Sequence, residues 1–261
     1  MSKVVRIVAI ITALVVAASA GVQLGIYFSE QIESNAANDE LASIADIPFV
    51  PEEECTLEEF EERNELSAYA QKLFGKSAPK KMPISGSQTK SSIEKAQKRK
   101  VNFPALKKQN NQIVAWVSIP NMSIDYAVVQ GKDNDYYLKH DVLRKTNKAG
   151  AIFLDSKLKS DFSNSDSIIY GHDMYDGSMF GSLMKYRDKS FRNKHQYIFV
   201  YTPHATKKYR VSSQFKTTSS ELRPDNSKTK TLSLVTCVDS AGKTHYVVRA
   251  KLVSSKKPGV K

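Results

Sequence analysis

The sequence contains few of the residues that define disulfide-rich or metal-binding proteins. Among 261 residues there are only two cysteines, Cys55 and Cys237, and five histidines. No CxxC pair is present, and the histidines have neither HxxxH nor HExxH spacing. Two such cysteines do not make a disulfide framework. We therefore expect no metal and no cofactor, and we interpret Cys55, which lies in an acidic segment, as incidental.

Nucleic-acid-binding motifs are also absent, although the net charge of the chain is +12. The charge is unevenly distributed, since residues 52–65 are strongly acidic and most of the chain after Lys72 is basic. This distribution argues against one uniform binding surface, so no nucleic-acid partner is expected. Anionic lipid headgroups and anionic wall polymers are the expected counterparts of the basic segments.

One long apolar run is present, from Ile7 to Phe28, and Lys3 and Arg6 precede it. The run is long enough to cross a bilayer as a helix, and the positive charges before it predict that the N-terminus stays inside. A cleaved signal peptide is the alternative, because residues 18–20 (Ala-Ser-Ala) have the form of a signal peptidase site. Apolar residues continue past that point, so we favour an uncleaved anchor. Either way, the rest of the chain is expected to be exported.

From Gln112 onward the sequence changes to short β-type runs separated by turns. The eight runs are Ile113–Ile119, Ile124–Val129, Ala151–Leu154, Ser167–Tyr170, Tyr197–Tyr201, Tyr209–Phe215, Thr231–Thr236 and Tyr246–Val253. Eight strands with turn-like connections predict a closed β-barrel, and on pattern alone a β-sandwich stays open. Residues Phe180–Tyr186 are expected to form a helical turn after the fourth strand.

Two strand ends carry the candidate chemistry. Alternation along the seventh run places Cys237 on the face opposite Leu232 and Leu234, at the end of the strand, where a substrate can reach the thiol. The fourth run ends in Tyr-Gly-His at His172. A cysteine with a histidine elsewhere in the chain is the sequence trace of thiol catalysis, because the thiolate needs a proton acceptor or a cationic neighbour.

These segments resemble the sortases, the cysteine transpeptidases of Gram-positive cell surfaces. The resemblance rests on Tyr-Gly-His at His172, on the Thr-Cys strand end, and on the strand that follows. A finer similarity to class B sortases lies in Ala115–Val117, Ile124–Gln130, Asp133–Leu138 and Gly150–Asp155. The similarity covers the chain from Trp116 to its end. It implies an all-β fold, a closed eight-stranded sortase-type barrel with N-terminal helices and a membrane anchor.

The resemblance also implies the residue roles. Cys237 is expected to be the nucleophile that holds the acyl group as a thioester, with Thr236 as a supporting residue. His172 is expected to move protons to the leaving amine and from the incoming one. In sortases an arginine on the next strand donates to the oxyanion. His245 occupies that position here, and Arg249 lies four residues further on, on the same face.

The choice of oxyanion donor therefore differs from the family pattern. We favour Arg249, because a bulge or register shift in the turn Val238–Thr244, which contains Gly242, would bring its guanidinium to Cys237. His245 is the alternative donor. A second departure is the connection Phe215–Lys230, which is shorter than the helix-bearing loop of class B sortases and puts their preference for Asn-Pro-type sorting signals in doubt.

The predicted organisation has three parts. Residues 1–30 form a cytoplasmic tip and transmembrane signal-anchor, residues 31–100 a helical and linker stalk, and residues 101–261 the catalytic barrel. Within the stalk, Thr56–Glu59 is a capping box, Lys76–Ser92 reads as a solvated linker, and Ile93–Lys100 as a short basic helix.

The expected activity is cleavage of a C-terminal sorting signal after Thr, with transfer of the surface protein to a peptidoglycan-precursor or pilin amine. Two alternatives remain. The first is a catalytically silent sortase-like module that binds surface proteins, which the His245 departure favours. The second is another exported cysteine transpeptidase, such as an L,D-transpeptidase, although the Ser/His-x-Gly-Cys signature of that class is absent.

Overall fold

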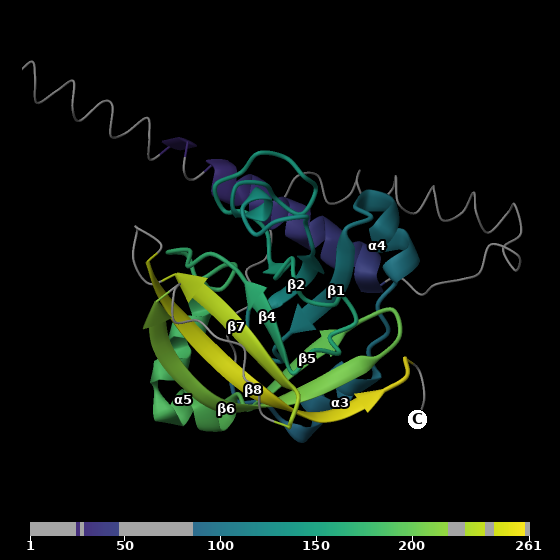
Figure 1. Ribbon diagram of the computed structural model, residues 1–261, viewed down its shortest axis with the longest axis vertical. Coiled ribbons are helices and arrows are strands. Elements are labelled where there is room, and N and C mark those ends of the chain that lie inside the picture. Colours follow the sequence, from purple (N-terminus) through teal and green to yellow (C-terminus); the bar gives the residue numbers. More distant parts are fainter. Residues whose placement is uncertain (1–24, 27–28, 47–85, 219–227, 238–242, 259–261) are drawn as a thin grey trace, which may run out of the picture.

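The computed structural model describes residues 25–26, 29–46, 86–218, 228–237 and 243–258. Eight strands form a closed barrel in the order β1-β2-β3-β4-β7-β8-β6-β5 (Figure 1). The strands are β1 (Ile113–Ser118), β2 (Asp125–Val129), β3 (Phe153–Leu154), β4 (Asp166–Tyr170), β5 (Tyr197–Tyr201), β6 (Thr206–Thr218), β7 (Thr231–Cys237) and β8 (Thr244–Lys256). The predicted closed barrel is confirmed, and the sandwich is excluded.

Strands β6 and β8 are longer than the apolar runs that predicted them. They pair antiparallel from Thr206↔Lys256 to Thr218↔Thr244. The added positions are mostly polar, so apolar periodicity does not detect them. Backbone hydrogen bonds to the partner strand, rather than burial, hold them in the sheet. The pattern therefore located both strands but underestimated their length.

Alternation along the strands separates the barrel interior from its outer face. Leu232 and Leu234 of β7 and Val248 of β8 point into the main core, and all three are fully buried. Val235 and Val247 instead join a small outer cluster with Ile168. The interior face of β7 and β8 is thus the one that the sequence predicted, and Cys237 shares the outer face with Val235.

Short helices fill the connections of the barrel. They are α3 (Lys90–Lys98), α4 (Phe103–Gln109), η2 (Tyr136–Leu138), η3 (Gly181–Arg187) and α5 (Lys189–Lys194). The helical turn expected at Phe180–Tyr186 is η3. Helix α3 begins at Lys90 rather than at Ile93, because Thr89 and Ser92 form a capping box that stabilises an earlier first turn.

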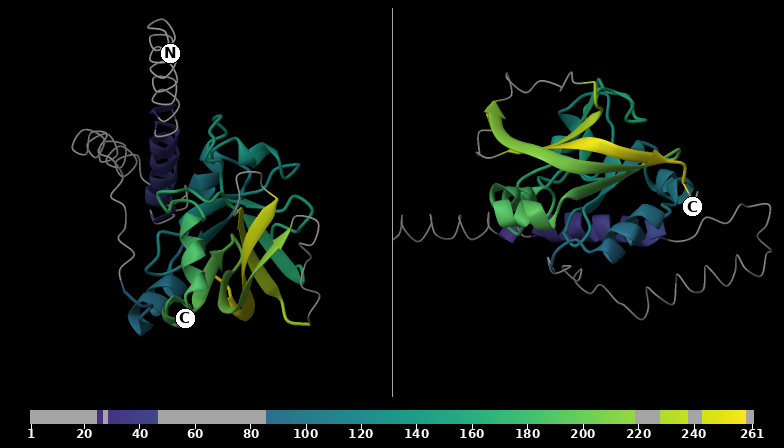
Figure 2. Two further views of the ribbon diagram at one scale, coloured as in Figure 1. Left: turned by 90° about the vertical axis from the view of Figure 1, so that its left-hand side faces the viewer. Right: turned by 90° about the horizontal axis from the view of Figure 1, so that it is seen from below.

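A second apolar core lies outside the barrel, between strands and helices. The helix of residues 29–46 contributes Leu41 and Ala45, and α4 contributes Leu106; these pack against Trp116 and Phe199 of the strands. Figure 2 shows this helix, in purple, along the face of the barrel that lies away from β6 and β8. The packing against the barrel buries the apolar stripe of the helix.

Arg99 joins the end of this helix to the barrel. Its Nε donates to Asp46 at 2.7 Å, and its Nη1 donates to Asp125 of β2 at 2.6 Å. The guanidinium also lies over the rings of Trp116 and Tyr201, at 5.3 and 5.7 Å from their centroids. One cation therefore connects the helix, the segment after α3 and three strands.

Several N-terminal predictions lie outside the described residues. These are most of the apolar run Ile7–Phe28, Cys55, the capping box Thr56–Glu59 and the greater part of the Lys76–Ser92 linker. Within the ranges that the structure does describe, no helix is both long and apolar enough to span a bilayer.

The position of Arg99 generates a stability prediction. Arg99→Ala should lower the free energy of unfolding by about 2–3 kcal/mol, less than for a fully buried pair because Asp46 remains largely exposed. Urea unfolding followed by fluorescence of the single tryptophan, Trp116, measures the change. Lys100→Ala, which removes an exposed cation one residue away, should change it by less than about 0.5 kcal/mol. Equal values for the two variants would show that the joint contributes nothing.

Candidate active site

Cys237 is the last residue of β7 and is half-buried on the outer face of the barrel. The ladder between β7 and β8 is regular, and it places Cys237 directly opposite His245. Directly opposed residues of an antiparallel pair project to the same face of the sheet. The side chain of His245 is therefore the cross-strand neighbour of the thiol.

His172 reaches the same edge from another part of the chain. Strands β4 and β7 pair in parallel, with Tyr170 opposite Val235, and the Gly171 N–H donates to the Val235 carbonyl at 3.1 Å. Paired strands lie about 4.8 Å apart, and continuing this register by two residues past the end of β4 aligns His172 with Cys237. The structure thus brings together two residues that are 65 positions apart in sequence.

Gly171 is required by the packing beneath His172. A Cβ at this position would lie 2.4 Å from the Ile152 side chain and 2.8 Å from the ring of Phe180. Only a residue without a side chain lets the strand end pass this close to the core. The Tyr-Gly-His sequence therefore has a steric reason as well as a chemical one.

The imidazole of His172 is held by a backbone carbonyl. Its Nε2 lies 2.9 Å from the carbonyl oxygen of Leu138. A carbonyl oxygen only accepts, so Nε2 carries the hydrogen, and in the neutral ring Nδ1 carries the lone pair that can accept a proton. Gly150 lies against the ring as well, since a Cβ there would be 3.1 Å from His172 Cδ2.

The segment Asp133–Leu138, one of the family-like motifs, builds this cradle. Asp133 Oδ1 accepts hydrogen bonds from the backbone N–H groups of Asp135 and Tyr136, and the carbonyl of Tyr137 accepts from Ala151. These bonds fix the turn from which the Leu138 carbonyl points at His172. Sequence reasoning missed Leu138, because a backbone acceptor has no residue-type signal.

Arg249 is not brought to Cys237 by the register. The bulge or shift expected in the β7–β8 turn is absent from the ladder, which runs without interruption from Thr231↔Lys251 to Cys237↔His245. Arg249 consequently lies opposite Ser233, four residues or about 13 Å of strand from the thiol. The residues of the turn between 238 and 242 lie outside the described part of the chain.

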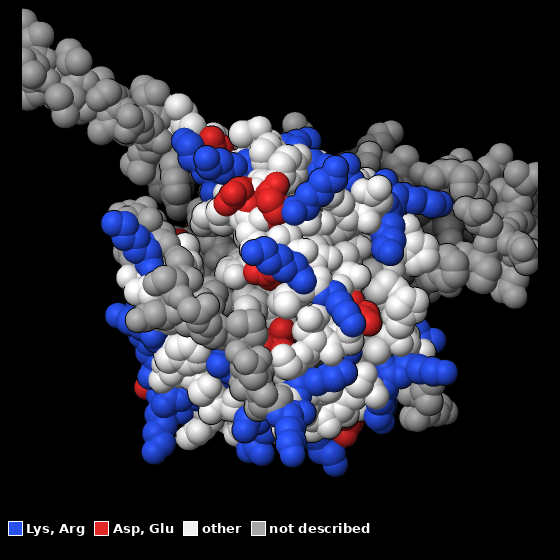
Figure 3. Space-filling model, viewed as in Figure 1, with Lys and Arg blue, Asp and Glu red and all other residues white. Residues whose placement is uncertain are grey.

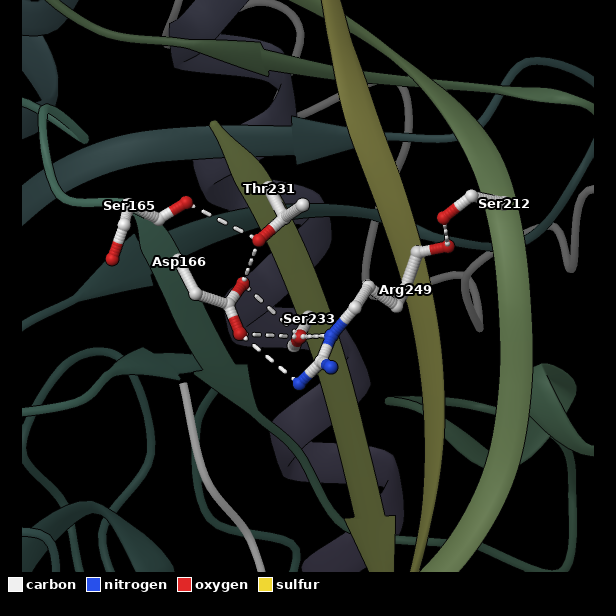
Figure 4. A network of polar contacts seen from close by, with 6 residues as sticks. All are labelled: Ser165, Asp166, Ser212, Thr231, Ser233 and Arg249. Carbon is white, nitrogen blue, oxygen red and sulfur yellow. Dashed lines mark hydrogen bonds and ion pairs between the residues drawn. The ribbon is translucent and has the colours of Figure 1, made fainter. Parts of the chain in front are cut away.

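The guanidinium of Arg249 takes part in a buried polar cluster (Figure 4). Its Nε donates to Ser233 Oγ at 2.9 Å, and its Nη2 lies 3.2 Å from Asp166 Oδ2. Asp166 is fully buried and also accepts from the hydroxyls of Ser233 and Thr231. A buried carboxylate is stable only when it is paired and hydrogen-bonded, so these contacts direct Arg249 away from the cysteine edge.

The predicted supporting residue, Thr236, lies on the opposite side of the strand from the thiol. It is 1% exposed, and it is paired with Tyr246, which belongs to the interior core. Its hydroxyl has no hydrogen-bond partner among the described atoms. Any support that Thr236 gives to Cys237 therefore acts through packing of the strand end.

The outer face next to the thiol is apolar. Ile168, Val235 and Val247 form a small cluster there, and Tyr170, Leu158 and Phe215 pack against it while remaining partly exposed. The cluster lies between the Cys237–His245 edge and the Arg249–Asp166 pair. A peptide that extends from the thiol along this face contacts the apolar side chains first and the Arg249–Asp166 ion pair beyond them.

Two further properties of the site are its surface charge and its capacity to bind a metal ion. Figure 3 shows Lys and Arg spread over most of the face that carries β7 and β8, with few acidic side chains. The described residues contain no group of three or more His, Cys, Asp or Glu side chains that could hold a metal ion. The arrangement supplies a thiol, an imidazole and a second histidine for proton transfer and nucleophilic attack.

The cradle around His172 generates the second prediction. Gly150 has a φ of +61°, and a Cβ there would lie 2.6 Å from the Tyr137 carbonyl oxygen. Gly150→Ala should therefore displace the ring and slow alkylation of Cys237 by iodoacetamide near neutral pH. Gly86→Ala is the matched control, because Gly86 has a φ of +75° but open space around it. Both variants should lose about 1–2 kcal/mol to backbone strain, Gly150→Ala should lose more because of the clash, and only Gly150→Ala should change thiol reactivity. Identical alkylation rates would contradict the cradle.

Comparison with known proteins places these features in one family. Residues 117–253 match the Sortase domain. Sortase B of Listeria monocytogenes is 47% identical over 90 residues, which cover 34% of this chain and 37% of that protein. Sortase B of Staphylococcus aureus is 35% identical over 119 residues, 46% of this chain and 49% of that protein. The matched regions thus span less than half the length of these two relatives.

A solved structure extends the similarity. The crystal structure of sortase B from Bacillus anthracis superimposes with a TM-score of 0.54 at 29% identity and covers 76% of this chain and 98% of that one. The β4 and β7 edge that joins His172 and Cys237 lies within the matched Sortase domain. The chain belongs to the sortase family and is similar to its class B members.

Proposed function

We propose that this protein is a cysteine transpeptidase of the sortase type. The single observation that carries the proposal is the parallel register of β4 and β7, which, continued two residues past β4, supports a partnership of His172 with the outward-facing thiol of Cys237. The thiolate is the nucleophilic form of cysteine, and a neighbouring imidazole is the usual means of forming it. Membership of the sortase family supports the same reaction.

The reaction proceeds in two balanced steps. In the first, the Cys237 thiol gives its proton to His172, Sγ attacks the scissile carbonyl, the peptide C–N bond breaks, and His172 passes the proton to the leaving amine, so that the acyl half remains as a thioester. In the second, an incoming amine loses a proton to His172 and attacks the thioester, and the thiol is released. With Nε2 fixed on Leu138, Nδ1 is the atom that exchanges these protons.

The substrate proposal is a surface protein with a C-terminal sorting signal that is cleaved after Thr. The acceptor is an amine of a peptidoglycan precursor or a pilin. The apolar outer cluster around Val235 and Val247 supports binding of an extended apolar peptide next to the thiol. We further propose that the N-terminal apolar run anchors the protein in the cell membrane with its N-terminus inside and the barrel outside, as Lys3 and Arg6 suggest.

Cysteine and histidine variants test the activity. Cys237→Ala should abolish cleavage of a sorting peptide and leave thermal unfolding unchanged, whereas Cys55→Ala should retain full activity. His172→Ala should lower the rate by about two to four orders of magnitude while Cys237 still reacts with iodoacetamide at high pH. Peptide cleavage is followed by mass spectrometry, which should also detect the acyl group on Cys237. Turnover by Cys237→Ala, or none by the wild type with any surface-protein signal, would contradict a transpeptidase.

The position of His245 favours one second candidate. A neutral imidazole stabilises an oxyanion less than a permanent cation does, so a sortase with histidine here is expected to be slow. In the extreme, the barrel would bind sorting signals without cleaving them and would be a silent surface-binding module. Binding of a sorting peptide to the wild type without formation of any acyl-enzyme would support this alternative.

We propose His245, rather than Arg249, as the side chain that faces the oxyanion. His245→Arg should raise the cleavage rate at least about tenfold, because a fixed cation at the cross-strand position stabilises developing negative charge. Arg249→Ala should leave the rate per folded molecule unchanged but lower the free energy of unfolding by about 3 kcal/mol, since Asp166 loses its buried partner. A loss of rate in Arg249→Ala without a loss of stability would restore Arg249 as the donor.

A further inference from the structure

The helix of residues 29–46 changes character along its buried face. Its second half buries Leu41 and Ala45 against the outer core, and this apolar contact fixes the helix on the barrel. The part up to Asn38 buries mainly polar residues, namely Gln31, Ser34 and Asn38, beside the small apolar Ala37. Burying a hydrogen-bonded polar side chain adds less stability than burying an apolar one. The polar residues of the first half therefore serve a purpose other than stabilising the fold by packing.

The polar half of the helix contacts the loop that follows His172. Gln31 Nε2 donates to Ser178 Oγ at 2.8 Å, and Asn35 Nδ2 lies 3.4 Å from Asp176 Oδ2. Ser178 Oγ in turn donates to the other oxygen of Asp176 at 2.6 Å. The two helix residues are one turn apart, and they hold two loop residues that are already bonded to each other.

This loop is tied directly to the backbone of His172. The Phe180 N–H donates to the His172 carbonyl at 2.9 Å, and Asp173 pairs with Met179 in an isolated β-bridge. These two contacts close the loop into a short hairpin with Ser178 next to its base. A displacement of Ser178 is therefore transmitted to the residue that carries the imidazole.

The same helix also holds the segment on the other side of the imidazole. Asn147 is buried, and its Nδ2 donates to the Glu30 carbonyl at 2.8 Å. The Asn147 carbonyl accepts from Gly150 N–H at 3.1 Å, and Gly150 is the residue that lies against the His172 ring. One helical turn, from Glu30 to Asn35, is thus bonded to both segments that flank the histidine.

We propose that Gln31 and Asn35 are positioning residues for His172, and that the first half of this helix keeps the imidazole aligned with Cys237. This inference rests on the proposed function only for its kinetic readout.

The test uses the full chain with the variants Gln31→Ala and Asn35→Ala, singly and together. Misplacement of a catalytic group by about 1 Å lowers rates up to about a hundredfold, so the double variant should lose at least about tenfold in kcat with KM changed less than about twofold. Glu33→Ala, on the exposed face of the same helical turn, should match the wild type in both parameters. An unchanged kcat in the double variant would overturn the proposal.

A second readout separates positioning from loss of folding and needs no sorting peptide. Near neutral pH the double variant should be alkylated by iodoacetamide at Cys237 several-fold more slowly than the wild type. At about pH 10, where the thiolate forms without help from His172, the two rates should be equal. Equal slowing at both pH values, together with a lower Tm, would indicate a merely structural role and would also overturn the proposal.

A double-mutant cycle locates the coupling. If Gln31 acts through Ser178, then the effects of Gln31→Ala and Ser178→Ala on log kcat should not add. The variant that combines these two substitutions should resemble the slower of the two single variants. Additive effects would show that Gln31 acts elsewhere. If the wild type itself turns over no peptide, the proposed function fails, whereas the alkylation profile still decides whether the helix positions His172.

Discussion

The parallel pairing of β4 and β7 is the constraint on which the site depends. Parallel strands run in the same direction, so their carboxyl ends meet at one edge of the sheet; β7 ends there at Cys237, and β4 ends at Tyr170, two residues before His172. No local turn joins the two residues; the whole chain from β4 to β7 must fold back before they meet. The histidine and the thiol are therefore brought together only by the closed barrel.

The regular β7–β8 ladder decides which side chains lie near the thiol. Since it has no bulge, the position opposite Cys237 belongs to His245, and Arg249 is held at Ser233 by the buried carboxylate of Asp166. Moving Arg249 toward the cysteine would remove its ion pair with the fully buried carboxylate of Asp166, at a cost of several kcal/mol. The contacts with Asp166 and Ser233 therefore keep the guanidinium of Arg249 at the buried carboxylate rather than at the thiol.

The sequence predicted what residue types and alternation can encode. The strands and the outward direction of the thiol followed from apolar periodicity, whereas the choice of a closed barrel over a sandwich followed from the family resemblance. The partnership of Cys237 with His172 was predicted from their chemistry and the family motifs. The partner of Arg249 did not follow, because Asp166 lies 83 residues away and its burial depends on the β4–β7 pairing. Leu138 and Gly150 were missed for a related reason, since one acts through its carbonyl and the other through the absence of a side chain.

Polar contacts, rather than apolar packing, orient the histidine. The ring is bonded to the Leu138 carbonyl, and the segments on both sides of it are bonded to the helix of residues 29–46. Such bonds are directional but add little net stability, because their groups exchange for water when the contact opens. Two oxygens of this interface, Gln31 Oε1 and Ser34 Oγ, are buried without a hydrogen-bond partner among the described residues. The interface therefore specifies a geometry without fixing it strongly, which suits the proton transfer proposed for His172.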